Sequence, residues 1–173
     1  MTQFIPNVTF AFREGDEAPA GGGCPIGGEF VFKTANELFD NKRVIIFSLP
    51  GAFTPTCSTY QLPGFEQQYN DFKAKGIDEI YCISVNDAFV MNEWARSLGI
   101  KNVKVIPDGA GKFTSLMGMT VDMSEIGFGP RSRRYAAIIS GGKVDHMFVE
   151  PESSATDPDP YGVSSPENVM KHL

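Results

Sequence analysis

The chain has 173 residues, with 21 acidic against 15 basic side chains and a formal net charge of −6. This length predicts one domain over residues 1–173, with room for a sizeable hydrophobic core. The acidic balance argues against nucleic acid or an anionic membrane as a main partner. No apolar stretch is long enough to cross a bilayer and the N-terminus lacks a secretory pattern, so we expect a cytoplasmic protein.

Seven segments rich in β-branched and aromatic residues predict strands. They are Val8–Arg13, Glu29–Lys33, Arg43–Leu49, Glu79–Val85, Val103–Ile106, Arg133–Ser140 and Lys143–Val149. Residues 44–47 and 80–83 are almost continuously apolar, which is typical of central strands covered on both faces. The last two strands are joined by Gly141-Gly142 and predict a hairpin with a two-residue turn.

Four segments between and after these strands predict helices. They begin with a capping box at Thr34–Glu37 and continue with Ser58–Lys75, Asp87–Leu98 and a final helix from Ser165 to Leu173. We expect Pro63-Gly64 to interrupt the second helix. The order of elements predicts an α/β fold, a mixed central sheet with helices on both faces. Gly15–Gly28 is interpreted as a flexible insertion inside an N-terminal hairpin.

The cysteines are Cys24, Cys57 and Cys82. Their odd number and the lack of a C-x-x-C pair argue against a disulfide scaffold and against a thiolate zinc site. With only two histidines in the chain, we expect no metal and no other cofactor. The pattern favours free thiols, of which one or more is reactive.

The segment that leads to Cys57 has the composition of a shaped, polar loop. An apolar strand ends at Leu49, two prolines and a glycine follow, and a helix begins near Cys57. A thiol in the first turn of a helix faces unpaired backbone N–H groups and the positive end of the helix dipole. Both favour the thiolate, which is the nucleophilic form. The residues alone leave open a second interpretation, in which Cys57 is a small buried hydrophobe.

Pro50, Thr54 and Cys57 also match P-x-x-x-[T/S]-x-x-C, the signature of the peroxiredoxins. The run from Leu49 to Cys57 resembles the peroxiredoxin V subfamily, also called type II. Further matching motifs follow in order at Leu62–Phe65, Ile83–Asp87, Phe89–Met91, Trp94, Pro107–Gly109, Gly127–Tyr135 and Phe148–Pro151. The resemblance covers most of residues 34–173.

This resemblance implies a thioredoxin-like fold, a homodimer, and a thiol-dependent peroxidase that reduces hydrogen peroxide and small organic hydroperoxides. It implies that Cys57 attacks the terminal peroxide oxygen and is left as sulfenic acid, while the Thr54 hydroxyl contacts the peroxide. It also implies that Arg134 reaches Cys57, and a guanidinium there can hold the thiolate and polarise the peroxide together. Pro50 would shield the site from water.

Sulfenic acid must then be reduced by a second thiol. Residues 150–173 hold no cysteine, and Cys82 lies in an apolar strand, where we expect it to be structural. Cys24 lies in the glycine-rich segment, where it either reaches Cys57 or is incidental. Relatives of this subtype without a resolving cysteine use glutathione with glutaredoxin, in some bacteria fused after a C-terminal helix similar to 169–173. The resemblance therefore implies glutathione and glutaredoxin as partners.

Two rival functions depend on the same cysteine. A disulfide oxidoreductase is disfavoured because the C-x-x-C pair is missing. A redox-sensing or chaperone-like binding protein switched by oxidation of Cys57 stays open, and turnover with a thiol reductant distinguishes it from a peroxidase. Gly127-Phe128-Gly129 is interpreted as a turn rather than a nucleotide loop. We expect Arg131 and Arg133 to be surface residues, and His146 to be packed or on the surface.

Overall fold

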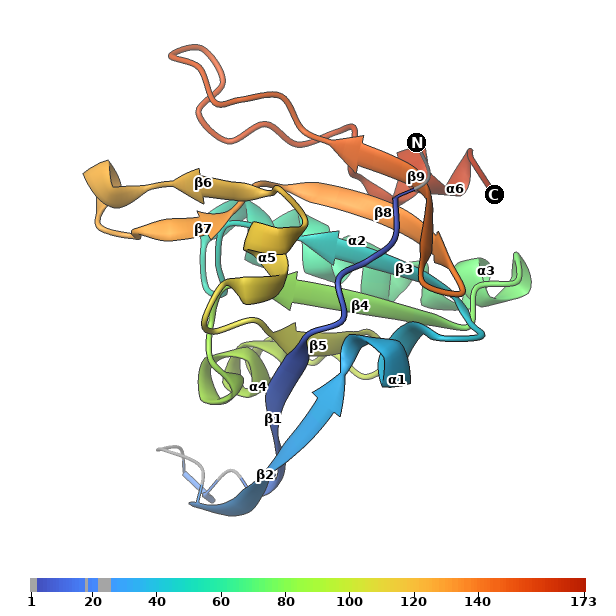
Figure 1. Ribbon diagram of the computed structural model, residues 1–173. Coiled ribbons are helices and arrows are strands. Elements are labelled where there is room, and N and C mark those ends of the chain that lie inside the picture. The colour runs from blue at the N-terminus through green and yellow to red at the C-terminus, as the bar shows by residue number, and fades with distance from the viewer. Residues whose placement is uncertain (1–2, 18, 22–25) are drawn as a thin grey trace.

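A computed structural model, which describes residues 3–17, 19–21 and 26–173, has a five-stranded central sheet (Figure 1). The strand order is β5-β4-β3-β8-β9. The bounds are β3 (Arg43–Ser48), β4 (Glu79–Ser84), β5 (Lys104–Pro107), β8 (Tyr135–Ser140) and β9 (Lys143–Val149). β4 runs parallel to β3 and β5, whereas β8 runs antiparallel to β3 and β9. The predicted mixed sheet is therefore confirmed.

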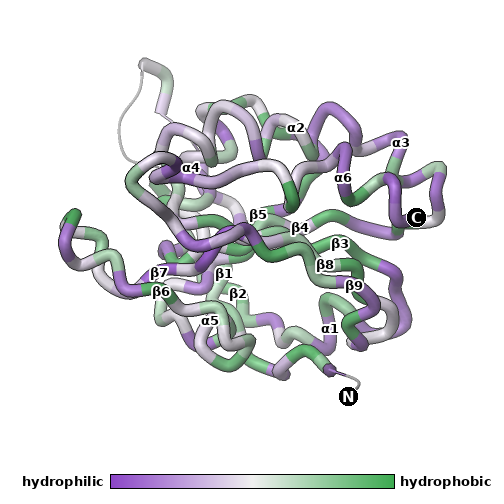
Figure 2. The backbone as a smooth tube through the Cα atoms, turned by 90° about the horizontal axis from the view of Figure 1, so that it is seen from above, coloured by the Kyte–Doolittle hydropathy of each residue, from purple (hydrophilic) through white to green (hydrophobic). Residues whose placement is uncertain are grey.

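Helices cover both faces of this sheet. They are α1 (Ala35–Phe39), α2 (Leu62–Gln67), α3 (Tyr69–Ala74), α4 (Ala88–Ser97), α5 (Lys112–Leu116) and α6 (Pro166–Met170). Figure 2 shows α2, α3, α4 and α6 on one side of the strands, with α1 and α5 on the other. This is the thioredoxin-like arrangement that the resemblance implied. Among the described residues, no helix is both long and apolar enough to span a membrane.

The core is divided by the sheet into two clusters. Along β3, Ile45 and Phe47 join the cluster beneath α2 and α4, whereas Val44 and Ile46 join the cluster on the opposite face. Phe47 also stacks on Phe65 of α2, with ring centroids 4.2 Å apart. Burial on both faces explains why the strand is continuously apolar. The same packing fixes the end of β3, from which the loop to Cys57 departs.

The N-terminal hairpin consists of β1 (Thr9–Glu17) and β2 (Ile26–Thr34) and projects from the sheet (Figure 1). Both strands are longer than expected, because Asp16 pairs with Gly27 and Glu17 with Ile26. The expected flexible insertion over 15–28 is thus wrong at both of its ends, where antiparallel pairing continues to Glu17 and Ile26. Cys24 lies outside the described residues.

The expected interruption at Pro63-Gly64 is also wrong. A π-helical turn over Cys57–Gln61 leads directly into α2, and the break before α3 falls at Gln68. The Leu62 amide bonds to the carbonyl of Cys57, five residues back. Pro63 has no N–H, so the change from π to α bonding takes place where one donor is missing.

A small hairpin, β6 (Thr120–Asp122) and β7 (Pro130–Ser132), was not predicted. A 3-10 turn at Ser124–Ile126 closes it, and Gly127 and Gly129 follow with φ of 79° and 70°. The interpretation of this glycine pair as a turn is confirmed. The strand expected from Arg133 begins only at Tyr135, because the Arg133 amide bonds instead to the carbonyl of Met119.

Candidate active site

The loop after β3 ends in a helix whose first turn contains Cys57. Residues 55 and 56 are already helical, and the Ser58 amide donates to the Thr54 carbonyl at 3.0 Å. Thr54 is therefore the N-cap residue. The Cys57 amide comes one residue before the first amide that donates in a helical hydrogen bond. The thiol lies at the positive end of the helix, as the sequence predicted. Cys57 is fully buried.

The loop is held in shape by polar contacts at the ends of two parallel strands. Asn86, after β4, accepts from the Ala52 amide at 3.0 Å and from the Ser84 hydroxyl at 2.7 Å. The Thr54 hydroxyl donates to the Gly51 carbonyl at 2.7 Å. Because its proton is used in this bond, the Thr54 oxygen keeps lone pairs that can accept from a ligand.

Arg134 approaches Cys57 from the segment just before β8. Its Nη1 donates to Cys57 Sγ at 3.4 Å and to Gln61 Oε1 at 2.5 Å, and its Nη2 donates to Asp159 Oδ1 at 2.6 Å. Burial acts to lower the pKa of Arg134, but its interactions with Cys57 and with the Asp159 carboxylate outweigh it, and the pKa is raised overall. The guanidinium therefore stays charged beside the sulfur.

Arg134 and Gln61 each carry one further buried donor. Arg134 Nε and Gln61 Nε2 have no hydrogen-bond partner among the residues that the structure describes. A buried donor without a partner costs about 1–3 kcal/mol. A ligand oxygen placed against either nitrogen recovers that energy, so the arrangement suits a small molecule that carries oxygen acceptors.

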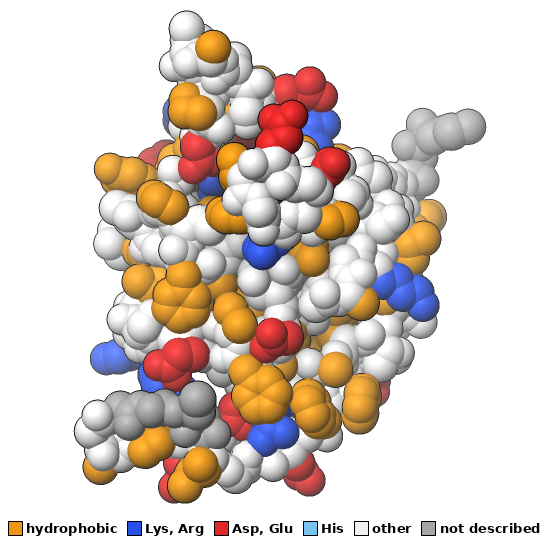
Figure 3. Space-filling model, turned by 90° about the vertical axis from the view of Figure 1, so that its left-hand side faces the viewer, with side chains coloured by type: hydrophobic (Ala, Val, Ile, Leu, Met, Phe, Trp, Pro, Cys, Tyr) orange, Lys and Arg blue, Asp and Glu red, His pale blue; other side chains and the backbone are white. Residues whose placement is uncertain are grey.

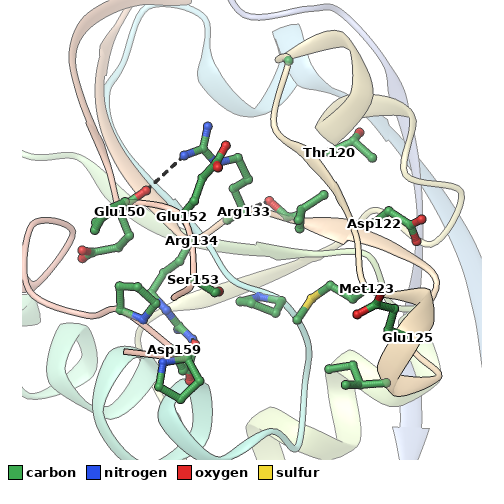
Figure 4. Close-up of a pocket in the computed structure, with 18 residues that line it drawn as sticks. Thr120, Asp122, Met123, Glu125, Arg133, Arg134, Glu150, Glu152, Ser153 and Asp159 are labelled. Atoms are coloured by element: carbon green, nitrogen blue, oxygen red, sulfur yellow. Dashed lines mark hydrogen bonds and ion pairs between the residues drawn. The ribbon is translucent and has the colours of Figure 1, made fainter. Parts of the chain in front are cut away.

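A cavity of 610 Å³ opens beside this site, lined by Pro50, Arg134 and Asp159 together with the β6–β7 hairpin and the connector, residues 150–165 between β9 and α6. Figure 4 shows Asp159 of the connector and Glu125 of the hairpin on opposite sides of it. Among the described residues, Cys57 and Thr54 are not part of the lining. The cavity therefore reaches Pro50 and Arg134, and the sulfur lies behind them.

Arg131 does not lie free on the surface, so that expectation is wrong. It is half-buried, with Nη1 donating to the Pro50 carbonyl at 3.2 Å and Nε to the Phe128 carbonyl at 3.1 Å. Arg133 is also half-buried and donates to the Glu150 carbonyl at 3.2 Å. The contact with Pro50 depends on how the β6–β7 hairpin lies against the loop, which residue patterns did not indicate. The contact with Glu150 joins the segment just before β8 to the residue after β9.

Gln61 and Asp159 are site residues that the sequence reasoning missed. Gln61 could have been found, because it follows Cys57 by four residues and this spacing places both side chains on one face of a helix. Asp159 gave no comparable signal, because it contacts a residue 25 positions away from within an irregular segment.

The predictions for Cys82, Cys24 and His146 compare with the structure as follows. Cys82 is fully buried in β4, and burial, followed by the charge of Cys57, raises its pKa well above the usual range. Its predicted structural place is confirmed. Cys24 is not among the described residues. His146 lies exposed on β9, beside Phe148. The described residues hold no group of three or more His, Cys, Asp or Glu arranged to hold a metal ion.

Comparisons with known proteins find relatives of this chain in sequence and in structure. The family model described as Redoxin matches residues 13–163. A peroxiredoxin of Rhizobium etli is 55% identical over all of this chain and 96% of its own length. The hybrid peroxiredoxin hyPrx5 of Haemophilus influenzae is 45% identical over 98% of this chain, which spans 64% of that protein.

Among solved structures, the Plasmodium falciparum antioxidant protein, a 1-Cys peroxiredoxin, superposes with a TM-score of 0.87 at 38% identity, covering 99% of this chain and 97% of that one. The similarity thus extends over the whole length of the chain, in sequence and in fold. The chain belongs to the redoxin family as a peroxiredoxin, a thiol peroxidase, as its resemblance to peroxiredoxin V implied.

Proposed function

We propose that Cys57 is the nucleophile with which this protein reduces hydrogen peroxide and small organic hydroperoxides. The observation that carries the proposal is the contact of 3.4 Å between Arg134 Nη1 and Cys57 Sγ in a fully buried helix start. A permanent positive charge beside a desolvated sulfur favours the thiolate, and the thiolate is the reactive form.

In the proposed reaction the thiolate attacks the terminal peroxide oxygen, so an S–O bond forms as the O–O bond breaks. Sulfur is oxidised to sulfenic acid, and the departing oxygen takes up a proton and leaves as water or an alcohol. Negative charge develops on that oxygen, where fixed donors lower the barrier. Arg134 Nε, which has no partner among the described residues, is the donor available for it.

Thr54 and Pro50 have supporting roles in this proposal. The Thr54 hydroxyl donates its proton to the Gly51 carbonyl. Its oxygen can therefore accept from the O–H of the peroxide, which orients the terminal peroxide oxygen toward the sulfur. Pro50 lines the cavity, and in this proposal it shields the thiol from solvent. Its carbonyl is held by Arg131, which keeps that shield in place.

We further propose glutathione with glutaredoxin as the reductant. Cys82 is a poor internal alternative because it is buried in β4 and its pKa is raised by that burial. The resemblance to relatives that carry a fused glutaredoxin favours glutaredoxin as the source of the reducing thiol. Because Cys57 is fully buried, a thiol carried by another protein reaches its sulfenic acid only after the first helical turn moves.

We propose a homodimer as the working assembly, as the resemblance implied. Phe53 next to Thr54 is 56% exposed, and Leu116 and Ile126 are more exposed still. Figure 3 shows hydrophobic side chains at several places on the face that includes the β6–β7 hairpin. Apolar side chains near an active-site loop are suited to burial against a second copy.

The test is steady-state consumption of hydrogen peroxide with glutathione and glutaredoxin. We compare wild type with Cys57→Ser and Cys24→Ser, and with Cys82→Ala as a matched cysteine control. Turnover lost only in Cys57→Ser supports the external thiol. Loss in Cys24→Ser as well makes Cys24 the resolving thiol. If wild type consumes no more than one peroxide per chain with any thiol donor, the proposal fails and the redox-sensor alternative replaces it.

A further inference from the structure

The guanidinium of Arg134 is fixed at two points, one inside the helix and one on the connector. Its side chain is 3% exposed. Gln61 holds Nη1 at 2.5 Å, and Asp159 holds Nη2 at 2.6 Å. A planar group held at one nitrogen can pivot about that contact, whereas two contacts define its plane. The direction in which Nη1 meets the sulfur therefore depends on both Gln61 and Asp159.

Two prolines of the connector restrict the backbone at Asp159. Pro158 and Pro160 flank it, and a residue before proline is confined to extended conformations. Pro160 is buried, while residues 151–159 are exposed. The sequence therefore holds Asp159 at the point where the connector first enters the protein interior.

The far end of the connector is clamped by a buried carboxylate. Glu150 Oε1 accepts from the Gly162 amide at 2.8 Å, the Ser164 amide at 2.7 Å and the Ser164 hydroxyl at 2.8 Å. Glu150 itself is buried directly after β9. The segment that carries Asp159 is thereby tied to the sheet on both sides.

From these contacts we infer that Asp159 is a positioning residue for peroxide reduction, acting through Arg134. Among the described contacts, its side chain meets Arg134 and not the sulfur. Its carboxylate holds Nη2, so that Nη1 stays directed at Cys57 Sγ and Nε stays free for the peroxide. The inference rests on the proposed roles of Cys57 and Arg134.

The expected effect follows from what Arg134 loses. Without the Asp159 carboxylate, Nη2 of Arg134 loses its acceptor at 2.6 Å. The guanidinium then turns toward another acceptor or toward water. A hydrogen bond to a charged group is worth enough to change a rate by about ten- to hundredfold. Asp159→Ala should therefore slow the reaction with hydrogen peroxide at least about tenfold.

Asp159→Asn separates positioning from charge, because the amide oxygen still accepts from Nη2. We expect this variant to stay within about threefold of wild type. Asp157→Ala is the matched control, since it removes the same charge from the same exposed connector. The described contacts of Asp157 are made by its backbone and survive the change.

The assay is a single-turnover reaction of the reduced protein with hydrogen peroxide, without any thiol reductant. The fluorescence of Trp94 reports it, because this single tryptophan donates to Ser58 Oγ at 2.9 Å, next to Cys57. Slow Asp159→Ala with near-wild-type Asp159→Asn and Asp157→Ala supports the inference. Asp159→Ala at the wild-type rate overturns it, as does an Asp159→Asn as slow as the alanine variant. Wild type that shows no reaction instead refutes the proposed function.

Discussion

Replacing Arg134 tests whether charge alone or the shape of the guanidinium supports Cys57. Arg134→Lys keeps one positive charge, whereas Arg134→Met keeps a side chain of similar length without charge. In the protein one guanidinium spans Cys57 and Gln61 through Nη1 and Asp159 through Nη2. A single ammonium nitrogen cannot span the same acceptors.

The magnitudes follow from the contacts that each variant loses. Lysine loses at least one charge-assisted hydrogen bond, worth about 1.5–3 kcal/mol, so its rate with hydrogen peroxide should fall about ten- to hundredfold. A methionine side chain has no donor for the negative charge that develops on the departing oxygen, and removal of such donors lowers a rate about a hundred- to thousandfold. We therefore expect wild type to be fastest, then lysine, then methionine.

The measurement is the single-turnover rate followed by Trp94 fluorescence, with the thermal unfolding midpoint of each variant as a check of the fold. A lysine variant as fast as wild type would show that the fork of the guanidinium is not needed. A folded methionine variant as fast as wild type would refute the reasoning about Arg134 altogether.

Three further predictions follow from buried or polar contacts. Cys82→Ala should lower the free energy of unfolding by about 1 kcal/mol in urea titrations, because it leaves a small cavity, and should leave peroxide consumption unchanged. Gln61→Glu should slow peroxide reduction about tenfold, because a buried carboxylate competes with the thiolate for Arg134, and alkylation of Cys57 by iodoacetamide should slow with it. Burial acts to raise the pKa of Glu66, but the amides of 101–103 outweigh it and the pKa is lowered from 4.5. The ionised Glu66 therefore stabilises the folded protein above pH 4.5, and this stabilisation is lost as the pH falls through the lower pKa of the folded state. Glu66→Gln should make the free energy of unfolding less dependent on pH in the acid range. An unchanged pH dependence would contradict this.

The parts of the fold that residue patterns predicted are those with strong local signals. β3 and β4 are buried on both faces, and their apolar runs have no polar interruption. The turn between β8 and β9 places both Gly141 and Gly142 at positive φ, of 55° and 79°, which their lack of a side chain permits. Ser165 caps α6 by accepting from the Asn168 amide, as its position before Pro166 indicated.

The elements that were missed are short or held by distant partners. β6, β7 and α5 have three to five residues, too few for periodicity to be read. The helix continues from the π-helical turn at Cys57 into α2 with Pro63 in its first turn, whereas a proline alone suggests a break.

The residues of the candidate site likewise divide into those with a local signal or a family motif and those held only by distant contacts. The place of Cys57 at a helix start could be read from the loop residues, and the approach of Arg134 came from the family resemblance alone. Asp159 and Arg131 could not be found, because their contacts span 25 and 81 positions and depend on how the connector and hairpin fold.

The most direct test of the account is to find which sulfur hydrogen peroxide oxidises. The reduced protein is treated with one equivalent of hydrogen peroxide in the presence of dimedone, which traps sulfenic acid, and the adduct is located by mass spectrometry. We expect one adduct per chain, on Cys57, and none in Cys57→Ser. An adduct confined to Cys24 or Cys82, or oxidation that persists unchanged in Cys57→Ser, would contradict the central claim.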